Sequence, residues 1–210
     1  MPLKRDGRDF VGRHGETVFN ASRRLQGDTL HTPLTRNGVI QAMEMGQAMR
    51  DALGARPALT LWASPTGRAL QTLAIIADYL DLDWHSVRTD ERLTEIGMGS
   101  WGGRYYAELT AEVGPVILPG GLLRSAPDGE RYDQIATRVA GWLADTADDP
   151  GDRLVIMHGI SSRVMRGVMT GAPMDACGAP VLPGHPQGTV TMIEGGRETM
   201  VHLGTGHAPA

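Results

Sequence analysis

The stretch that decides the fold of this chain is Asp9-Phe10-Val11-Gly12-Arg13-His14-Gly15-Glu16-Thr17. It opens on a short, largely apolar run, which predicts a strand, and it turns polar at Arg13 and His14. A guanidinium offers fixed-geometry donors to an anionic oxygen, and an imidazole beside it can attack as a nucleophile. Gly15 lets the backbone come close to a ligand. A structural histidine beside a loop is the alternative.

A second motif follows an apolar run at residues 59–63, which predicts a short buried strand. Ser64 is a good N-cap and Pro65 suits the first helical position, so a helix is expected over residues 65–80. Arg68 then lies one turn into this helix, near the positive end that favours an anion. A capped surface helix with a solvated arginine would explain the same pattern.

A second histidine closes the third motif. Residues 154–157 are apolar and predict a buried strand, His158 and Gly159 follow it, and residues 160–170 predict a helix. A side chain at the carboxyl end of a strand lies at the functional edge of an α/β sheet. The alternative is a histidine that serves the core.

The fourth motif places a carboxylate before a glycine-rich loop that contains one large aromatic residue, Trp101. Glu95 stands in this position, two residues before Gly97. A carboxyl group beside a flexible loop can reach a leaving oxygen and act as a general acid. A solvated loop carboxylate is an equal alternative.

Together these motifs resemble the histidine phosphatase superfamily, also called phosphoglycerate mutase-like. The resemblance spans about residues 10 to 195, and several motifs in the same order make it specific for the superfamily. The motifs that carry it are Arg13-His14-Gly15-Glu16-Thr17, Ser64-Pro65 with Arg68-Ala69 and Gln71-Thr72, the Glu95 loop, and His158-Gly159. It implies a three-layer α/β sandwich, with a mostly parallel central sheet and helices on both faces.

The rest of the chain favours the same architecture, because predicted strands alternate with predicted helices. Further helices are expected over residues 35–53 and 130–146, and further strands over residues 84–88, 189–193 and 199–203. The helix at 35–53 is expected to bury one face, made of Val39, Met43, Gly46 and Leu53. Residues 104–128 are expected to form a small irregular cap over the site. At 210 residues, a single domain spanning 1–210 is expected.

The resemblance implies a phosphomonoesterase that hydrolyses a small phosphorylated metabolite through a phosphohistidine. His14 is the expected nucleophile, and Glu95 is expected to protonate the leaving alkoxide and then to activate water. The groups expected to hold the phosphoryl oxygens are Arg13, Asn20, Arg68, His158 and Gly159. These groups supply the positive charge, so neither a metal nor a cofactor is expected. The nearby arginines should lower the pKa of His14 in the empty enzyme.

Three positions depart from the family pattern. Gly12 stands where a bulkier residue is common, so looser packing is expected there. Gly102 replaces a frequent glutamate, which leaves Glu95 as the sole nearby acid candidate. Gln187-Gly188-Thr189 stands where a triplet that begins with asparagine is frequent, and Gly188 is expected to bring a backbone amide near the phosphate. An apolar entrance for the leaving group is expected from Met98, Trp101, Tyr105, Tyr106, Leu122 and Leu123.

Two other functions stay open. A cofactor-dependent phosphoglycerate mutase would use the same phosphohistidine, but it needs extra basic residues for a carboxylate and a second phosphate. The basic residues between Glu95 and His158 are Arg104, Arg124, Arg131, Arg138 and Arg153. This short, base-poor segment favours hydrolysis. A non-catalytic protein that binds a phosphorylated ligand would tolerate the loss of His14 or Glu95, and both are present.

The composition of the chain limits the classes of partner and the compartments that are expected. The net charge of −4 gives no electrostatic support to a nucleic-acid partner, and no apolar run reaches membrane-spanning length. Cys177 is the single cysteine, so no internal disulfide can form. Residues 1–9 show no signal peptide, and the cytoplasm is the expected compartment. The resemblance also implies a homodimer.

Overall fold

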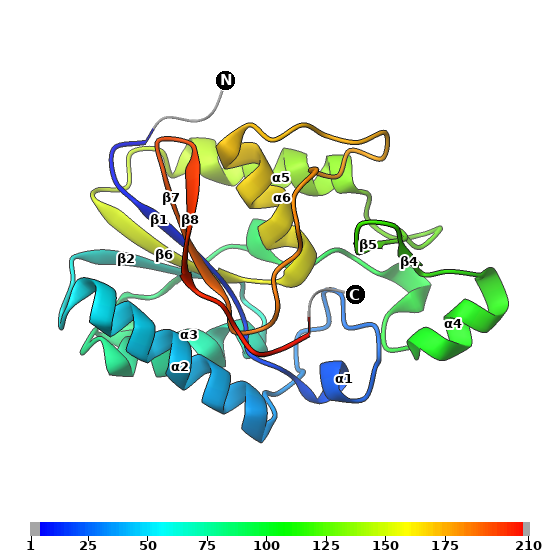
Figure 1. Ribbon diagram of the computed structural model, residues 1–210, viewed down its shortest axis with the longest axis horizontal. Helices are drawn as coiled ribbons and strands as arrows, with labels where there is room; N and C mark the ends of the chain where they lie inside the picture. The colour runs from blue at the N-terminus through cyan, green and yellow to red at the C-terminus, as the bar shows by residue number, and fades with distance from the viewer. Residues whose placement is uncertain (1–4, 208–210) are drawn as a thin grey trace.

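The computed structural model describes residues 5–207, which form a three-layer α/β fold (Figure 1). Within these residues the central sheet has six strands in the order β3-β2-β6-β1-β7-β8. Their bounds are β1 Asp9–Arg13, β2 Leu59–Ala63, β3 Arg88–Thr89, β6 Asp152–Met157, β7 Val190–Glu194 and β8 Arg197–His202. The first four strands of this order are parallel, whereas β7 and β8 form an antiparallel hairpin at one edge. The predicted mostly parallel sheet is therefore confirmed.

Helices cover both faces of the sheet (Figure 1). One face packs against α2 (Arg36–Leu53) and α3 (Gly67–Tyr79), and the other against α5 (Tyr132–Asp145) and α6 (Gly159–Thr170). The middle residues of β1 and β6 are apolar on both faces of the sheet, since both faces are buried there. In β1, for example, Phe10 belongs to the core beneath α2 and α3, and Val11 belongs to the core beneath α5 and α6.

Two sequence predictions about these elements were wrong, one about where a helix begins and one about a strand. The helix expected from residue 65 begins at Gly67 instead, and its N-cap Thr66 makes no side-chain capping bond. The Ser64 hydroxyl is drawn into a buried contact with Thr66 and does not cap the helix. Residues 84–88 are not a strand, since Trp84–Ser86 form a 3-10 turn capped by Asp83, and pairing with β2 starts only at Arg88.

The buried face of α2 also differs from the expected one. Of the four expected residues, Val39 and Met43 are exposed at 40% and 41%, whereas Gly46 is buried and Leu53 packs against the core. The residues that face the core are Gly38, Gln41, Ala42, Met45, Gly46 and Met49. A Cβ on Gly38 would lie 2.0 Å from the carbonyl oxygen of Glu16, and one on Gly46 would lie 2.8 Å from Tyr79. Close backbone approach at these two glycines fixes the rotation of the helix.

Residues 104–128 are more regular than expected. They hold α4 (Tyr106–Val113) and a small hairpin of β4 (Ile117–Leu118) and β5 (Leu122–Leu123), on the right of Figure 1. The buried side chain of Leu109 anchors α4, and the Tyr132 hydroxyl bonds the backbone of Leu123. These tertiary contacts order a segment that the local sequence left irregular. The remaining short helix, α1 (Val18–Ala21), follows β1.

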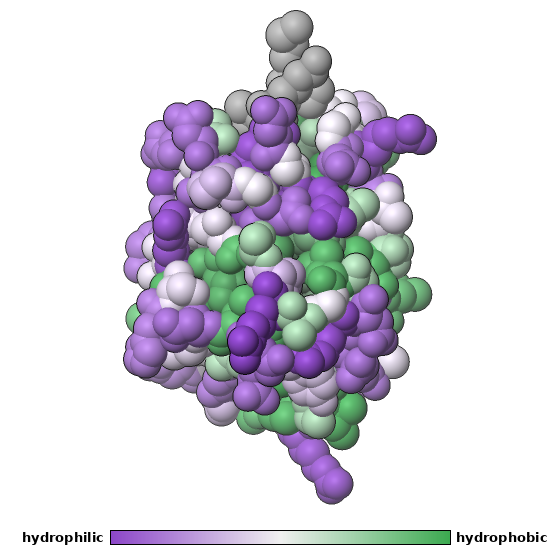
Figure 2. All heavy atoms as spheres, turned by 90° about the vertical axis from the view of Figure 1, so that its left-hand side faces the viewer, coloured by the Kyte–Doolittle hydropathy of each residue, from purple (hydrophilic) through white to green (hydrophobic). Residues whose placement is uncertain are grey.

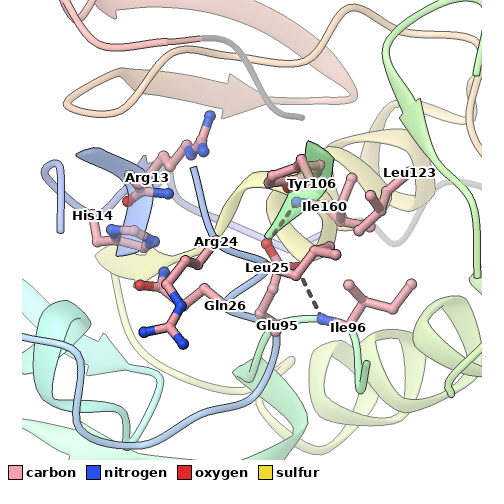
Figure 3. Close-up of a pocket in the computed structure, with 12 residues that line it drawn as sticks. Arg13, His14, Arg24, Leu25, Gln26, Glu95, Ile96, Tyr106, Leu123 and Ile160 are labelled. Carbon is pink, nitrogen blue, oxygen red and sulfur yellow. Dashed lines mark hydrogen bonds between the residues drawn. The ribbon is translucent and has the colours of Figure 1, made fainter. Parts of the chain in front are cut away.

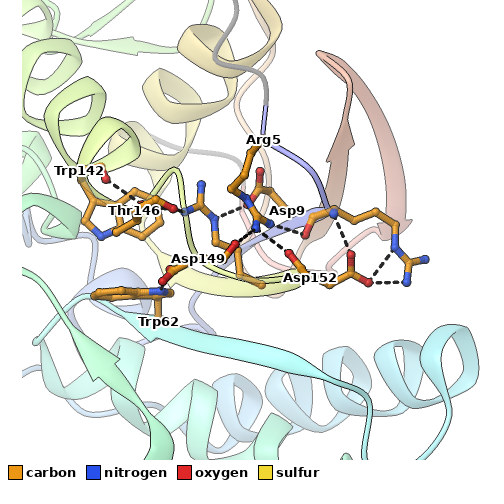
Figure 4. A network of polar contacts seen from close by, with 10 residues as sticks. Arg5, Asp9, Trp62, Trp142, Thr146, Asp149 and Asp152 are labelled. Carbon is orange, nitrogen blue, oxygen red and sulfur yellow. Dashed lines mark hydrogen bonds and ion pairs between the residues drawn. The ribbon is translucent and has the colours of Figure 1, made fainter.

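The strands β1 and β6 begin at a network of charged and polar groups (Figure 4). The buried Arg153 side chain pairs with Asp9 and donates to the Thr146 hydroxyl at 2.7 Å. Arg8 bonds Asp152 through two side-chain nitrogens. A buried charge is tolerated when it is paired and hydrogen-bonded, and here the pairs join the starts of neighbouring strands.

The surface on the left-hand side of Figure 1 carries hydrophilic side chains above and below a central hydrophobic band (Figure 2). Among residues 5–207, none of the helices combines the length and the apolar character that a bilayer crossing would need.

Candidate active site

His14 and His158 follow neighbouring strands at matching positions. β1 and β6 are parallel, and Arg13 at the end of β1 pairs with Met157 at the end of β6. His14 and His158, the residues that follow, therefore lie side by side at the carboxyl edge of the sheet. The two imidazole rings lie 5.2 Å apart between centroids, edge to face, with an interplanar angle of 63°. Two motifs 144 residues apart in sequence are therefore brought together by the register of the sheet alone.

His14 is buried and held in one tautomer. Its Nδ1 lies 2.6 Å from the carbonyl oxygen of Gly15, so Nδ1 carries the proton and donates it, and Nε2 keeps a free lone pair. Burial lowers the pKa of His14 well below its usual value, and the charges of Arg68 and Arg13 lower it further. The imidazole is thus neutral at neutral pH, in the direction that the sequence predicted, although burial is the larger cause.

The loop after His14 is fixed by backbone contacts. A Cβ on Gly15 would lie 2.3 Å from the carbonyl oxygen of Gly38, so Gly15 serves close approach to α2, whereas the sequence suggested approach to a ligand. The amide of Gly15 donates to the Thr72 hydroxyl at 3.1 Å. The amide of Glu16 donates to the Gln41 side chain at 2.7 Å. Both neighbouring helices thus hold the loop that presents His14.

Arg68 is fully buried and reaches across the site to His158. Its Nε donates to His158 Nδ1 at 3.1 Å, so the His158 proton lies on Nε2. Burial and the charge of Arg68 together lower the pKa of His158 well below its usual value. The Nη groups of Arg68 donate to three oxygens of the loop 27–32: the carbonyls of Gly27 and Thr29 and the Thr32 hydroxyl. In this structure Arg68 therefore ties a loop to His158 and does not line the pocket.

Arg13 lines the pocket, and hydrogen bonds to two backbone carbonyls hold its guanidinium. Its Nη1 donates to the carbonyl oxygens of His185 at 2.6 Å and His207 at 3.1 Å. Its buried Nε has no partner within residues 5–207. Burial lowers the pKa of Arg13 to about 10, which leaves it charged at neutral pH. A cation with an unused donor therefore lines the same pocket as His14.

Glu95 sits at the amino end of α6 and is not a solvated loop carboxylate. One carboxylate oxygen accepts from the amides of Ile96 and Ser161, both at 2.9 Å, and the other accepts from the amide of Ile160 at 3.0 Å (Figure 3). The first amides of a helix lack acceptors within the helix, and the side-chain oxygens of Glu95 supply them. Since α6 begins directly after His158, the same helix positions Glu95 and His158.

The pocket that Arg13, His14 and Glu95 share is small, about 50 Å³ (Figure 3), and His158, like Arg68, does not line it. Its polar lining consists of Arg13, His14, Asn20, Arg24, Gln26, Gly27, Glu95 and Tyr106. Its apolar lining consists of Leu25, Ile96, Leu123 and Ile160. Of the side chains expected at an apolar entrance, Tyr106 and Leu123 are present, whereas Met98 and Trp101 are buried in the core.

The sequence missed Arg24 and Gln26 as pocket residues. Arg24 donates to the carbonyl of Gly103 at 2.7 Å, and its guanidinium lies over the rings of Phe19 and Tyr105. The Gln26 side chain accepts from the Thr17 hydroxyl at 2.5 Å. Nothing in the local sequence shows that this segment turns back toward the His14 loop.

Three further positions, one asparagine and two glycines, complete the comparison with the sequence predictions. Asn20 lines the pocket, and its side-chain oxygen accepts from the amide and hydroxyl of Thr17. Gly159 starts α6 but does not line the pocket. The amide of Gly188 points to the carbonyls of Arg13 and His14, so it was wrongly expected at the phosphate.

The packing around Gly12 is tight, which corrects the expectation of a looser site. A Cβ there would lie 2.6 Å from Ile156 and 3.0 Å from Met45. Those two side chains fill the space that a bulkier residue would take. Within residues 5–207 no three or more His, Cys, Asp or Glu side chains lie together as metal ligands would.

Comparison with known proteins agrees with this geometry. Residues 10–204 match the model of the histidine phosphatase superfamily (branch 1). The chain is 36% identical to "Probable phosphoglycerate mutase GpmB" of Enterobacter sp. (strain 638), over 78% of this chain and 75% of that protein. The protein of the same name from Citrobacter koseri is 34% identical, with the same coverage.

Solved structures share the fold. A mycobacterial glucosyl-3-phosphoglycerate phosphatase in complex with VO3 superposes with a TM-score of 0.76 at 23% identity, covering 96% of this chain and 100% of that one. Bacillus stearothermophilus YhfR superposes with a TM-score of 0.71 at 26% identity, covering 92% and 95%. With its motifs, its sheet and the match over residues 10–204 in agreement, the chain belongs to the histidine phosphatase superfamily, branch 1.

Proposed function

We propose that this protein is a metal-independent phosphomonoesterase that hydrolyses a small phosphorylated metabolite through a phosphohistidine. The observation that carries the proposal is the state of His14. It is neutral, its Nδ1 proton is donated to Gly15, and its free Nε2 shares a pocket with the Arg13 guanidinium. A neutral imidazole beside a fixed cation is suited to attack phosphorus in a phosphate ester.

The reaction runs in two steps. His14 Nε2 forms a bond to phosphorus as the bond to the alcohol oxygen breaks, and protonated Glu95 gives its proton to that oxygen. Water then attacks the phosphohistidine, Glu95 takes a proton from the water, and inorganic phosphate leaves with His14 restored. Glu95 lines the pocket with His14, which supports this assignment.

Positive charge for the phosphoryl oxygens comes from side chains. Arg13 contributes its guanidinium, and Asn20, which lines the same pocket, contributes its side-chain amide. Arg68 and His158 bind the phosphoryl group when the Arg68 guanidinium exchanges one of its loop carbonyls for a phosphate oxygen. Gly159 supplies a backbone amide at the start of α6. Arginines can neutralise a phosphate with no metal ion.

Two further parts of the proposal concern partners and compartment. The substrate is a small phosphomonoester, because a pocket of about 50 Å³ holds little more than the phosphoryl group. The protein acts in the cytoplasm, without nucleic acid or membrane as a partner. Its net charge of −4 and its single cysteine support this, since disulfides are rare in reducing compartments.

A phosphoglycerate mutase is the second candidate, and the names of the relatives in Enterobacter and Citrobacter favour it. The structure supports hydrolysis, because each basic residue between Glu95 and His158 already has a partner and none lines the pocket. Arg104 pairs with Glu112, Arg124 with the carbonyl of Val113, Arg131 with Asp133, Arg138 with Glu130, and Arg153 with Asp9. No spare cation of this segment faces a second phosphate.

One assay separates these functions. The purified protein is incubated with a panel of phosphomonoesters, and with 3-phosphoglycerate plus catalytic 2,3-bisphosphoglycerate. We expect phosphate release from at least one monoester and little 2-phosphoglycerate. Isomerisation much faster than phosphate release would establish the mutase. Binding of phosphate or vanadate with no turnover of any ester would establish a non-catalytic protein.

A further inference from the structure

A second cavity, open to solvent, adjoins the pocket of His14 at Leu123. Its volume is about 670 Å³, compared with about 50 Å³ for the pocket itself. Within residues 5–207 the two share one lining residue, Leu123. Its side chain is nearly buried, with 5% exposed, and Figure 3 shows it on the far side of the pocket from His14. Leu123 therefore stands between a narrow reactive site and a much larger space.

Leu123 is held in place from two helices. The Tyr132 hydroxyl, at the start of α5, accepts from the Leu123 amide at 3.0 Å and donates to its carbonyl at 3.1 Å. From α6, the buried Arg163 donates to the carbonyls of Gly120 and Gly121 in the turn of the hairpin. Burial raises the pKa of Tyr132 above its usual value, so its hydroxyl keeps the proton that this double bond needs. The wall is a fixed part of the fold.

The lining of the second cavity suits an apolar group. Leu118, Leu122 and Tyr132 line it together with Leu123. Its charged side chains already have partners: Arg131 pairs with Asp133 within the lining, Arg124 donates to the carbonyl of Val113, and Asp175 accepts from two backbone amides. An aryl or alkyl group would bury its surface there with little competition from unpaired polar atoms.

We propose that Leu123 is the residue that sets the size of the alcohol group, and that the second pocket is an apolar subsite, open to solvent, which Leu123 separates from His14. The inference rests on the proposed phosphatase activity. With leucine at this position the enzyme takes phosphomonoesters with small alcohol groups. A smaller residue joins the two cavities and admits an alcohol group one aromatic ring longer.

The test compares phenyl phosphate with 4-phenylphenyl phosphate, which differ by one ring at the far end of the leaving group. For each enzyme form the ratio of kcat/KM for the larger substrate to that for the smaller is measured. Leu123→Ala should raise this ratio about 10-fold or more over the parent protein, because shape differences in apolar pockets discriminate by factors of this size. Leu123→Val should raise it by less. Tyr132→Phe, which frees the backbone of Leu123, should also raise it.

The matched control is Leu118→Ala, which enlarges the second cavity without touching the wall, and it should leave the ratio at the parent value. An unchanged ratio in Leu123→Val, Tyr132→Phe and any folded Leu123→Ala would overturn the inference, as would an equal rise in Leu118→Ala. Failure of the proposed function looks different, because neither the parent protein nor any variant would then release phosphate from either ester.

Discussion

The Nε of Arg68 donates to Nδ1 of His158 at 3.1 Å, and this contact joins two motifs that lie 90 residues apart. It fixes the His158 proton on Nε2 and keeps the ring neutral beside a buried guanidinium. The same arginine holds the loop that contains Gly27 and Thr29. Arg68 thus links the position of Gly27, which lines the pocket, to the tautomer of His158, to which the proposed mechanism assigns a phosphoryl-binding role.

His14→Ala should abolish turnover, because no other imidazole lines the pocket within residues 5–207. Rapid quench of the parent protein with a labelled substrate should trap an acid-labile, base-stable phosphoenzyme, which the variant lacks. His85→Ala, which removes an exposed histidine from a 3-10 turn far from the pocket lining, is the control and should retain full activity. Turnover at the parent rate in His14→Ala would refute the nucleophile assignment.

Glu95→Gln should slow hydrolysis of alkyl phosphates about 10²–10⁴-fold in single-turnover experiments, because their alkoxides leave poorly without a proton. The first step with p-nitrophenyl phosphate should be spared, since its phenolate leaves readily. The control is Glu130→Gln, which also changes a carboxylate bonded to this loop, at the amide of Gly97, but lies outside the pocket lining. Equal losses for both substrates would mean that Glu95 only positions the start of α6.

Activity should survive excess EDTA, and vanadate should inhibit by adopting the five-coordinate geometry of phosphorus in the transition state. The physical reason is that Arg13 supplies charge at the pocket wall. The measurement is phosphate release before and after dialysis against the chelator. Loss of activity that Mg²⁺ or Zn²⁺ restores would show that the metal-free mechanism is wrong.

The free energy of unfolding should fall as the pH drops below about 6.5. The folded-state pKa values of His14 and His158 lie well below the usual value, and that of His185 is lowered to about 4 by burial and by Arg166 and Arg13. Below pH 6.5 the unfolded chain binds protons that the folded protein excludes, so stability is complete above this pH and is lost on acidification. Each histidine contributes about 1.4 kcal/mol per pH unit.

Urea unfolding at pH 7.5, 6.0 and 5.0 measures this slope. His185→Gln removes one of the three groups and should flatten the dependence by about one proton. A free energy of unfolding that stays constant between pH 7 and pH 5 would contradict the burial of these imidazoles as neutral groups.

Local sequence settled much of the architecture. The apolar runs of β1, β2 and β6 predicted strands, and the helix expected over residues 35–53 is α2, with Thr35 as its N-cap. The family and the mostly parallel sheet were also predicted from the order of the motifs, and both are confirmed. The predicted catalytic and phosphate-binding roles remain predictions. These features follow from hydrophobic period and capping, which each short segment carries by itself.

What the sequence by itself determined is where strands and helices lie and which side chains stand at the strand ends. Only the tertiary structure decided that Glu95 accepts the amides of α6, that Arg68 turns to His158, and that Leu123 walls the pocket. Each of these relationships joins residues far apart in the chain. Their partners are selected by sheet register and by close packing such as that of Gly15 on Gly38, which no local pattern of residues encodes.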